Sequence, residues 1–196
     1  MKKFFSTLLA ASLMLLGTQA FAQMSVNAGY LSSSLSRENA KALNANGAYA
    51  GVSFNVPIAG GLAIAPGVYY SMINGENLAY GALPIGKMTE HAINVPLYLN
   101  YGIDLARDTK VFVFGGPTAQ YAIANSVKVS DNLKGSNFDE KNYNRMNVYL
   151  GGGLGFQVSA IQITVGYDYG MMNQYKGDNA PKIHRSNLKL GLGFVF

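Results

Sequence analysis

Hydrophobic and polar residues alternate with a period of two along most of the chain after residue 23. Between Glu90 and Tyr101, the odd positions carry apolar or aromatic side chains, while Asn94, Tyr98 and Asn100 occupy even positions. This period is typical of β-strands whose two faces meet different surroundings. We therefore expect eight strands, at about residues 24–32, 48–56, 62–71, 90–101, 109–122, 146–158, 161–171 and 185–196.

The connections between these strands alternate in length. Segments 57–61, 102–108 and 159–160 are short, whereas segments 33–47, 72–89, 123–145 and 172–184 are long and polar. Outer-membrane barrels combine tight periplasmic turns with longer external loops. An even strand count places both termini and all three short turns on the periplasmic side. The pattern predicts an all-β fold, an eight-stranded antiparallel up-and-down transmembrane β-barrel.

The two faces of the strands differ in a way that favours lipid outside the barrel. One face carries almost no charge, and a charge there would cost about 2–4 kcal/mol at mid-bilayer. The other face carries charges of both signs and many glycines, which suit a narrow, filled interior. The fifth strand is apolar on both faces, but Lys110, Thr118 and Gln120 favour an inward orientation for Phe112 and Phe114. An aromatic girdle is expected from the tyrosines near the ends of apolar faces, Tyr30, Tyr70, Tyr101, Tyr167 and Tyr169.

The first 22 residues have the three parts of a secretory signal peptide. Lys2 and Lys3 precede an apolar run at 8–16, and Ala20-Phe21-Ala22 forms a cleavage site before Gln23. The apolar run is too short to span a membrane, which takes about 20 residues. We expect a signal peptide at 1–22 and one barrel domain at 23–196.

Composition narrows the chemistry further. The chain has no cysteine, so disulfides and thiolate metal sites are excluded. Without Lys2 and Lys3, the 15 basic residues become 13 against 10 acidic ones, a net charge of +3. These charges are scattered, which argues against nucleic acid as a partner. No carboxylates accompany His91 and His184 at metal-ligand spacing, so we expect neither a metal site nor any other cofactor.

The C-terminus carries the most specific local pattern. The chain ends on one alternating apolar stripe, made of Leu188, Leu190, Leu192, Phe194 and Phe196. This stripe resembles the C-terminal assembly signal that the barrel-assembly machinery reads in bacterial outer-membrane barrels.

The whole mature chain resembles the small eight-stranded barrels of OmpX type, and more closely the PorT-like "outer membrane protein β-barrel domain" family. The resemblance rests on strand count, loop asymmetry, the terminal stripe and glycine-rich strands such as 149–156. It implies a location in the outer membrane of a Gram-negative bacterium. It also implies contact with lipid and lipopolysaccharide, and with the assembly machinery during biogenesis. We expect a monomer.

Inside the barrel, three charged residues share the inward parity of adjacent strands. Asp168 would lie opposite Asn187, within diagonal reach of Arg185 and Lys189. We hypothesise an interior ion network of Asp168, Arg185 and Lys189. Eight strands leave room for side chains but not for a wide channel.

One pair of residues raises an enzymatic alternative. His184 and Ser186 lie two apart on one face of a strand, in a pattern similar to the outer-membrane lipid A deacylases. That family supplies a glutamate downstream, and no Asp or Glu follows Ser186 here. We therefore expect a structural or adhesion-like surface role, neither a wide pore nor an enzyme. The alternatives are a lipid A-modifying enzyme and a soluble, secreted ligand-binding barrel.

Overall fold

The computed structural model describes residues 23–37, 40–80, 83–130, 133–135, 144–173 and 183–196. Its strands are β1 (Gln23–Arg37), β2 (Ala40–Ala59), β3 (Leu62–Tyr80), β4 (Leu83–Ala106), β5 (Thr109–Ser130), β6 (Leu133–Gly135), β7 (Met146–Val158), β8 (Ile161–Gly170) and β9 (Ile183–Val195). The described residues contain no helix long and apolar enough to cross a membrane. The expected signal peptide, including Ala20 and Ala22, lies outside the described residues, and Gln23 begins β1.

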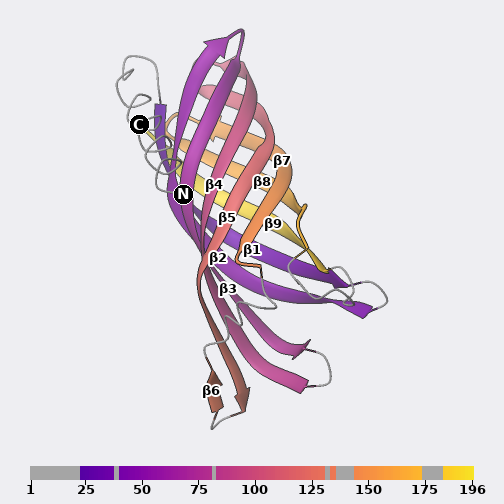
Figure 1. Cartoon of the computed structure of the whole chain (residues 1–196). Helices are drawn as coiled ribbons and strands as arrows, with labels where there is room; N and C mark the ends of the chain where they lie inside the picture. The colour runs from indigo at the N-terminus through magenta and orange to yellow at the C-terminus, as the bar shows by residue number, and fades with distance from the viewer. Residues whose placement is uncertain (1–22, 38–39, 81–82, 131–132, 136–143, 174–182) are drawn as a thin grey trace, which may run out of the picture.

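All strand pairings are antiparallel, and the sheet closes on itself. β1 pairs with both β2 and β9, while the β4–β5 pairing joins the two halves of the sheet. β6 is a three-residue strand that adds only to the far end of β5. Among the described residues, β1–β5 and β7–β9 therefore form the predicted eight-stranded barrel, which Figure 1 shows. Closure gives each wall strand two neighbours, so its backbone groups need no water.

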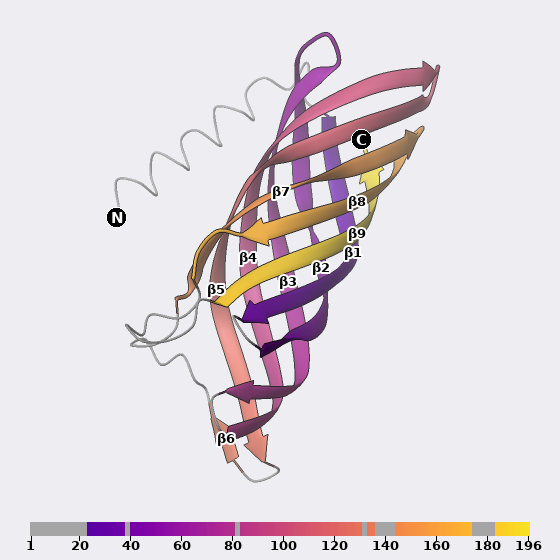
Figure 2. The ribbon, with the colours of Figure 1, turned by 90° about the vertical axis from the view of Figure 1, so that its right-hand side faces the viewer.

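The three short connections gather at one end of the barrel. They join Ala59 to Leu62, Ala106 to Thr109 and Val158 to Ile161. The first turn holds Gly60 and Gly61 at φ 56° and 84°, as a two-residue type I′ turn requires. Figure 2 shows these turns and the end of β9 at the top, with β6 at the opposite end. We call these the turn end and the hairpin end.

At the hairpin end, the strands run further than the sequence indicated. β3 and β4 stay paired to Tyr80 and Leu83, and β5 continues to Ser130. Much of the predicted loops 33–47, 72–89 and 123–145 is therefore β-strand. The sequence pattern misses these extensions because outward positions there, such as Asn46 and Asn74, are polar, so the apolar outer face that marks the other strand segments is lost. The fourth predicted loop, 172–184, falls largely outside the described residues.

The two faces of the wall are clearly separated. Large apolar side chains such as Leu150, Leu154 and Leu192 point outward, while the inward positions are mainly polar or glycine. The interpretation of the fifth strand is confirmed, because Phe112 is buried and Val113 is exposed.

Glycines in the wall make room for the inward phenylalanine rings. A Cβ added at Gly155 would overlap the ring of Phe112, and one at Gly153 would come within 2.6 Å of Phe114 Cζ. The register pairs these residues directly, Phe112 with Gly155 and Phe114 with Gly153. The glycine-rich β7 is therefore the part of the wall that lets two large rings fit in a narrow lumen.

Candidate functional site

An apolar surface surrounds the barrel between its two ends. The C-terminal stripe lies on this outer surface, with exposed fractions of 49–68% for Leu188, Leu190, Leu192, Phe194 and Phe196. The end of the stripe is fixed to the first strand, because the Phe196 backbone N–H donates to the Met24 carbonyl at 2.8 Å. In water, so much exposed apolar area would favour aggregation, so this surface suits an apolar surrounding.

Aromatic side chains border the apolar surface. Tyr101 pairs with Leu62 and Val113 near the turn end. The outward tyrosines nearer the hairpin end are Tyr30, Tyr70, Tyr121, Tyr167 and Tyr169. Tyrosine favours the level where hydrocarbon meets headgroups, because its ring is apolar and its hydroxyl is polar. The outward tyrosines therefore form an aromatic border of the apolar surface mainly towards the hairpin end.

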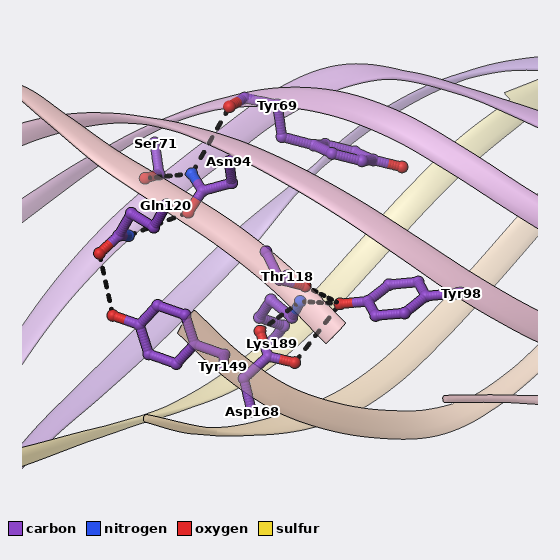
Figure 3. A network of polar contacts seen from close by, with 9 residues as sticks. All are labelled: Tyr69, Ser71, Asn94, Tyr98, Thr118, Gln120, Tyr149, Asp168 and Lys189. Carbon is purple, nitrogen blue, oxygen red and sulfur yellow. Dashed lines mark hydrogen bonds and ion pairs between the residues drawn. The ribbon is translucent and has the colours of Figure 1, made fainter. Parts of the chain in front are cut away.

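Inside the barrel, an ion pair between two adjacent strands is joined by a tyrosine from the opposite wall (Figure 3). Lys189 Nζ on β9 lies 2.6 Å from Asp168 Oδ2 on β8 and donates to Tyr98 Oη on β4 at 2.9 Å. Tyr98 also accepts from Thr118 Oγ1 at 3.1 Å and donates to Asp168 Oδ1 at 3.4 Å. The tyrosine therefore bridges the lumen. Gly151 on β7 leaves room for this ion pair, because a Cβ at that position would overlap the Asp168 carboxylate.

A second, more deeply buried ion pair lies nearer the hairpin end. Arg185 on β9 donates a hydrogen bond from each of its two terminal nitrogens to the carboxylate of Glu90 on β4, and Nη2 lies 3.2 Å from Oε2. Their side chains are only 2% and 1% exposed. Of the expected network, the structure therefore brings Asp168 and Lys189 together, while Arg185 reaches across the lumen to Glu90.

A chain of neutral hydrogen bonds fills the space beside these pairs. Tyr149 Oη donates to Gln120 Oε1 at 2.9 Å, and Gln120 Nε2 donates to Asn94 Oδ1 at 2.9 Å. Asn94 Nδ2 in turn donates to Ser71 Oγ at 2.8 Å. The chain runs from β7 through β5 and β4 to β3, as Figure 3 shows. Sequence reasoning missed it, although the inward parity of these polar residues was a usable signal.

The remaining interior space is small. A cavity of about 150 Å³ extends from Lys189 and Asp168 towards Gln23 and Gln157 at the turn end. Between this cavity and the hairpin end, the Arg185–Glu90 pair and the Tyr149 chain occupy the lumen. The arrangement is that of a small barrel filled by its own side chains.

The two residues of the enzymatic alternative lie on the outer surface. The His184 ring stacks on Tyr169 with centroids 5.8 Å apart, and its Nδ1 lies 3.0 Å from the Gly170 carbonyl oxygen. The group that orients this histidine is thus a backbone carbonyl. A hydrolytic triad uses a carboxylate in that place. The described residues contain no cluster of three His, Cys, Asp or Glu side chains that could hold a metal.

Comparisons with known proteins agree with this geometry. Residues 18–176 match the family model described as "outer membrane protein beta-barrel domain". No curated protein matches the sequence. Among solved structures, the attachment invasion locus protein Ail of Yersinia pestis is 12% identical with a TM-score of 0.50, covering 90% of this chain and 99% of that one. Neisserial surface protein A is 15% identical with a TM-score of 0.52, covering 88% and 97%. At this identity the likeness concerns the fold alone.

Proposed function

The chain belongs to the outer membrane protein β-barrel domain family, and from this premise we propose that it is an integral outer-membrane protein of a Gram-negative bacterium with a structural and surface-interaction role. The role is neither that of a wide pore nor that of an enzyme. The single observation that carries the proposal is the division of the barrel into an apolar outside and an ion-paired, filled inside.

The apolar outside supports the location. Burying apolar area in lipid is worth about 25 cal/mol per Å², so a surface rich in exposed Leu, Val and Phe gains greatly from a bilayer. Residues 1–22 would deliver the chain as a cleaved signal peptide, with cleavage after Ala22. The outward stripe that ends on Phe196 would then be read by the assembly machinery.

The filled inside supports a role without solute flow. Charged groups in a lumen are costly to separate once they are paired and desolvated. The Arg185–Glu90 pair and the Lys189–Asp168–Tyr98 cluster both span the lumen between distant strands. Water-filled passage would require both to open.

The hairpin end supports a role at the cell surface. The β3–β4 and β5–β6 hairpins run beyond the end of the β7–β8 pair, as Figure 1 shows. Projecting segments of this kind are where barrels of this class meet other molecules. The fold neighbour Ail is named an attachment invasion locus protein, which fits an adhesion-like role without specifying its target.

The location can be tested on membranes of a Gram-negative host that expresses the full chain. We expect the protein in the outer-membrane fraction, starting at Gln23, and migrating differently on gels before and after heating. Planar bilayers containing it should show no stable large conductance. Recovery in the soluble periplasm would instead support the secreted ligand-binding barrel, and large open steps would refute the filled lumen.

The role at the surface needs its own experiment. Cells that display the protein should adhere to cultured epithelial cells, and replacing residues 124–144 by a short turn should reduce adhesion without changing heat-dependent mobility. Equal adhesion of both strains would contradict the role of this hairpin. Lipid A deacylation by the wild type, lost in Ser186→Ala, would establish the enzymatic alternative instead.

A further inference from the structure

A continuous row of neutral polar residues crosses the outer surface at the hairpin end. The register pairs Ser32 on β1 with Asn46 on β2, and Asn46 with Asn74 on β3. Asn74 pairs with Thr89 on β4, and Thr89 with Ser126 on β5. Directly paired residues lie on the same face of a sheet. Five adjacent strands therefore contribute one amide or hydroxyl each to a single line, which we call the polar row.

The polar row points away from the lumen. Each member is next to a buried inward residue in the sequence, respectively Ser33, Ala45, Ile73, Glu90 and Asn125. Because side chains alternate between the two faces of a strand, the row faces outward. It is also accessible, since Asn46, Asn74 and Ser126 are exposed.

The row begins at the aromatic border of the apolar surface. Tyr30 precedes Ser32 by two residues on β1, and its hydroxyl donates to Asn46 Oδ1 at 2.6 Å. On β4, His91 follows Thr89 by two residues and stacks on Tyr70. If tyrosines mark the headgroup level, the polar row lies at that level and just beyond it.

The hydrogen bonds within the row leave donors for a ligand. Thr89 Oγ1 donates to Asn74 Oδ1 at 2.8 Å, just as Tyr30 donates to Asn46 Oδ1. Both amides therefore use their oxygen within the protein, while each Nδ2 has no protein partner among the described residues. A shallow groove runs along this part of the wall, lined by Asn44, Asn46, Gly47, Ala48, Met72 and Asn74.

From this arrangement we propose that the polar row binds the saccharide headgroup of a glycolipid in the outer leaflet. The five members of the row are amides and hydroxyls, which match sugar hydroxyls as donors and acceptors, and none of the five carries a charge. The apolar surface on the other side of the aromatic border would contact the acyl chains, so one lipid would meet the polar row with its headgroup and the apolar surface with its chains. The proposal rests on the proposed outer-membrane location, and it names the surface of the barrel that meets the lipid.

The test uses the full mature barrel in nanodiscs with three lipid compositions. The first contains phosphatidylethanolamine alone, the second adds phosphatidylglycerol, and the third adds digalactosyl diacylglycerol. The second arm offers an anionic phosphate without a sugar, and the third offers a neutral sugar without a phosphate. Native mass spectrometry after detergent release counts the added lipids that remain bound.

We expect the wild-type barrel to retain the galactolipid. In the triple variant Asn44→Ala, Asn46→Ala, Asn74→Ala, the amount of bound galactolipid should fall by about fivefold or more, since each neutral hydrogen bond contributes about 1 kcal/mol. The matched control, Met146→Ala with Met171→Ala, shortens exposed side chains on β7 and just after β8 and should retain the lipid. Preferential retention of phosphatidylglycerol, or equal retention of galactolipid by the triple variant, would overturn the proposal. Heat-dependent mobility of each variant reports insertion separately, so a failed location and a failed binding site give different results.

Discussion

Lys189 and Asp168 face each other inside the barrel at 2.6 Å, diagonally across the β8–β9 pairing in which Asp168 lies opposite Asn187. The pair is sheltered rather than sealed, because the lysine side chain is 20% exposed and the aspartate 5%. Tyr98 from the far wall completes it by accepting from Lys189 and donating to Asp168. A local pair on adjacent strands is thereby tied to the opposite side of the lumen.

Replacing Lys189 with Met should destabilise the barrel by about 3 kcal/mol, because Asp168 would keep a buried charge without its partner. A loss of about 3 kcal/mol is at the low end of the range for breaking a buried ion pair, and we expect the low end because Lys189 retains some solvent contact. Urea unfolding in lipid vesicles, followed by gel mobility without heating, measures the change. The double variant with Asp168→Asn should cost less than the sum of the two single changes. Simple additivity would show that the pair contributes nothing as a pair.

Replacing Glu90 with Gln should lower the stability of the barrel at least as much as Lys189→Met does, because the Arg185 left without its partner is more deeply buried than Lys189. The same unfolding measurement applies. In the variant Arg185→Lys, the charge remains but the two-pronged contact to Glu90 is lost, so an intermediate loss of stability is expected. If Glu90→Gln unfolds at the same urea concentration as the wild type, the buried pair does not support the fold.

These two ion pairs differ in how far the sequence reveals them. Asp168 and Lys189 lie on consecutive strands joined by a hairpin, so strand parity alone brings them within reach. Glu90 and Arg185 are 95 residues apart on walls that are not neighbours, and their contact depends on the diameter and stagger of the closed barrel. Parity predicts that both side chains face inward, but not that they meet.

The wall itself was predictable, because lipid outside and polar residues inside impose a period of two wherever the strand lies in the membrane. That constraint ends beyond the aromatic border. β5 continues to Ser130, well past the predicted end at residue 122, through a segment with polar residues on both faces. In that segment an outward position is taken by Ser126 instead of a large apolar residue, while the backbone pairing with β4 continues.

Replacing Gly155 with Ala should destabilise the barrel by about 1–3 kcal/mol, because the new Cβ would overlap the Phe112 ring. The change Gly115→Ala is the matched control, since the nearest atom to a Cβ there, the Gly151 carbonyl oxygen, lies at 3.4 Å. Unfolding in urea compares the two. Phe112→Leu should recover part of the loss in the Gly155 variant. Equal effects at both glycines would point to backbone flexibility rather than overlap.

Replacing Leu192 with Lys should cost about 2–4 kcal/mol if the middle of the outer surface lies in hydrocarbon. Leu192 is 59% exposed on the outside of β9, in the middle of the five-residue terminal stripe, and it pairs with Ala28 and Ile163 rather than with a tyrosine. The control is Leu105→Lys, beside a turn-end connection, where the substitution should be nearly neutral. Unfolding in vesicles provides the comparison. Similar small effects at both sites would argue that no bilayer surrounds the barrel.

Deleting Phe196 should impair assembly far more than stability. The folded barrel would lose one exposed ring at its rim, its contact with Phe194 and the backbone bond to Met24, all at the edge of the structure. The assembly machinery would lose the last residue of the stripe that it is proposed to read. We therefore expect periplasmic degradation of the deletion in cells, whereas the same chain refolded from urea into vesicles should recover the heat-dependent mobility of the wild type. The control Phe156→Ala removes another exposed outward ring, from β7, and should reach the outer membrane. Normal surface display of the deletion would contradict the assembly role of the stripe. Failure in both cells and vesicles would show that Phe196 is needed for folding itself.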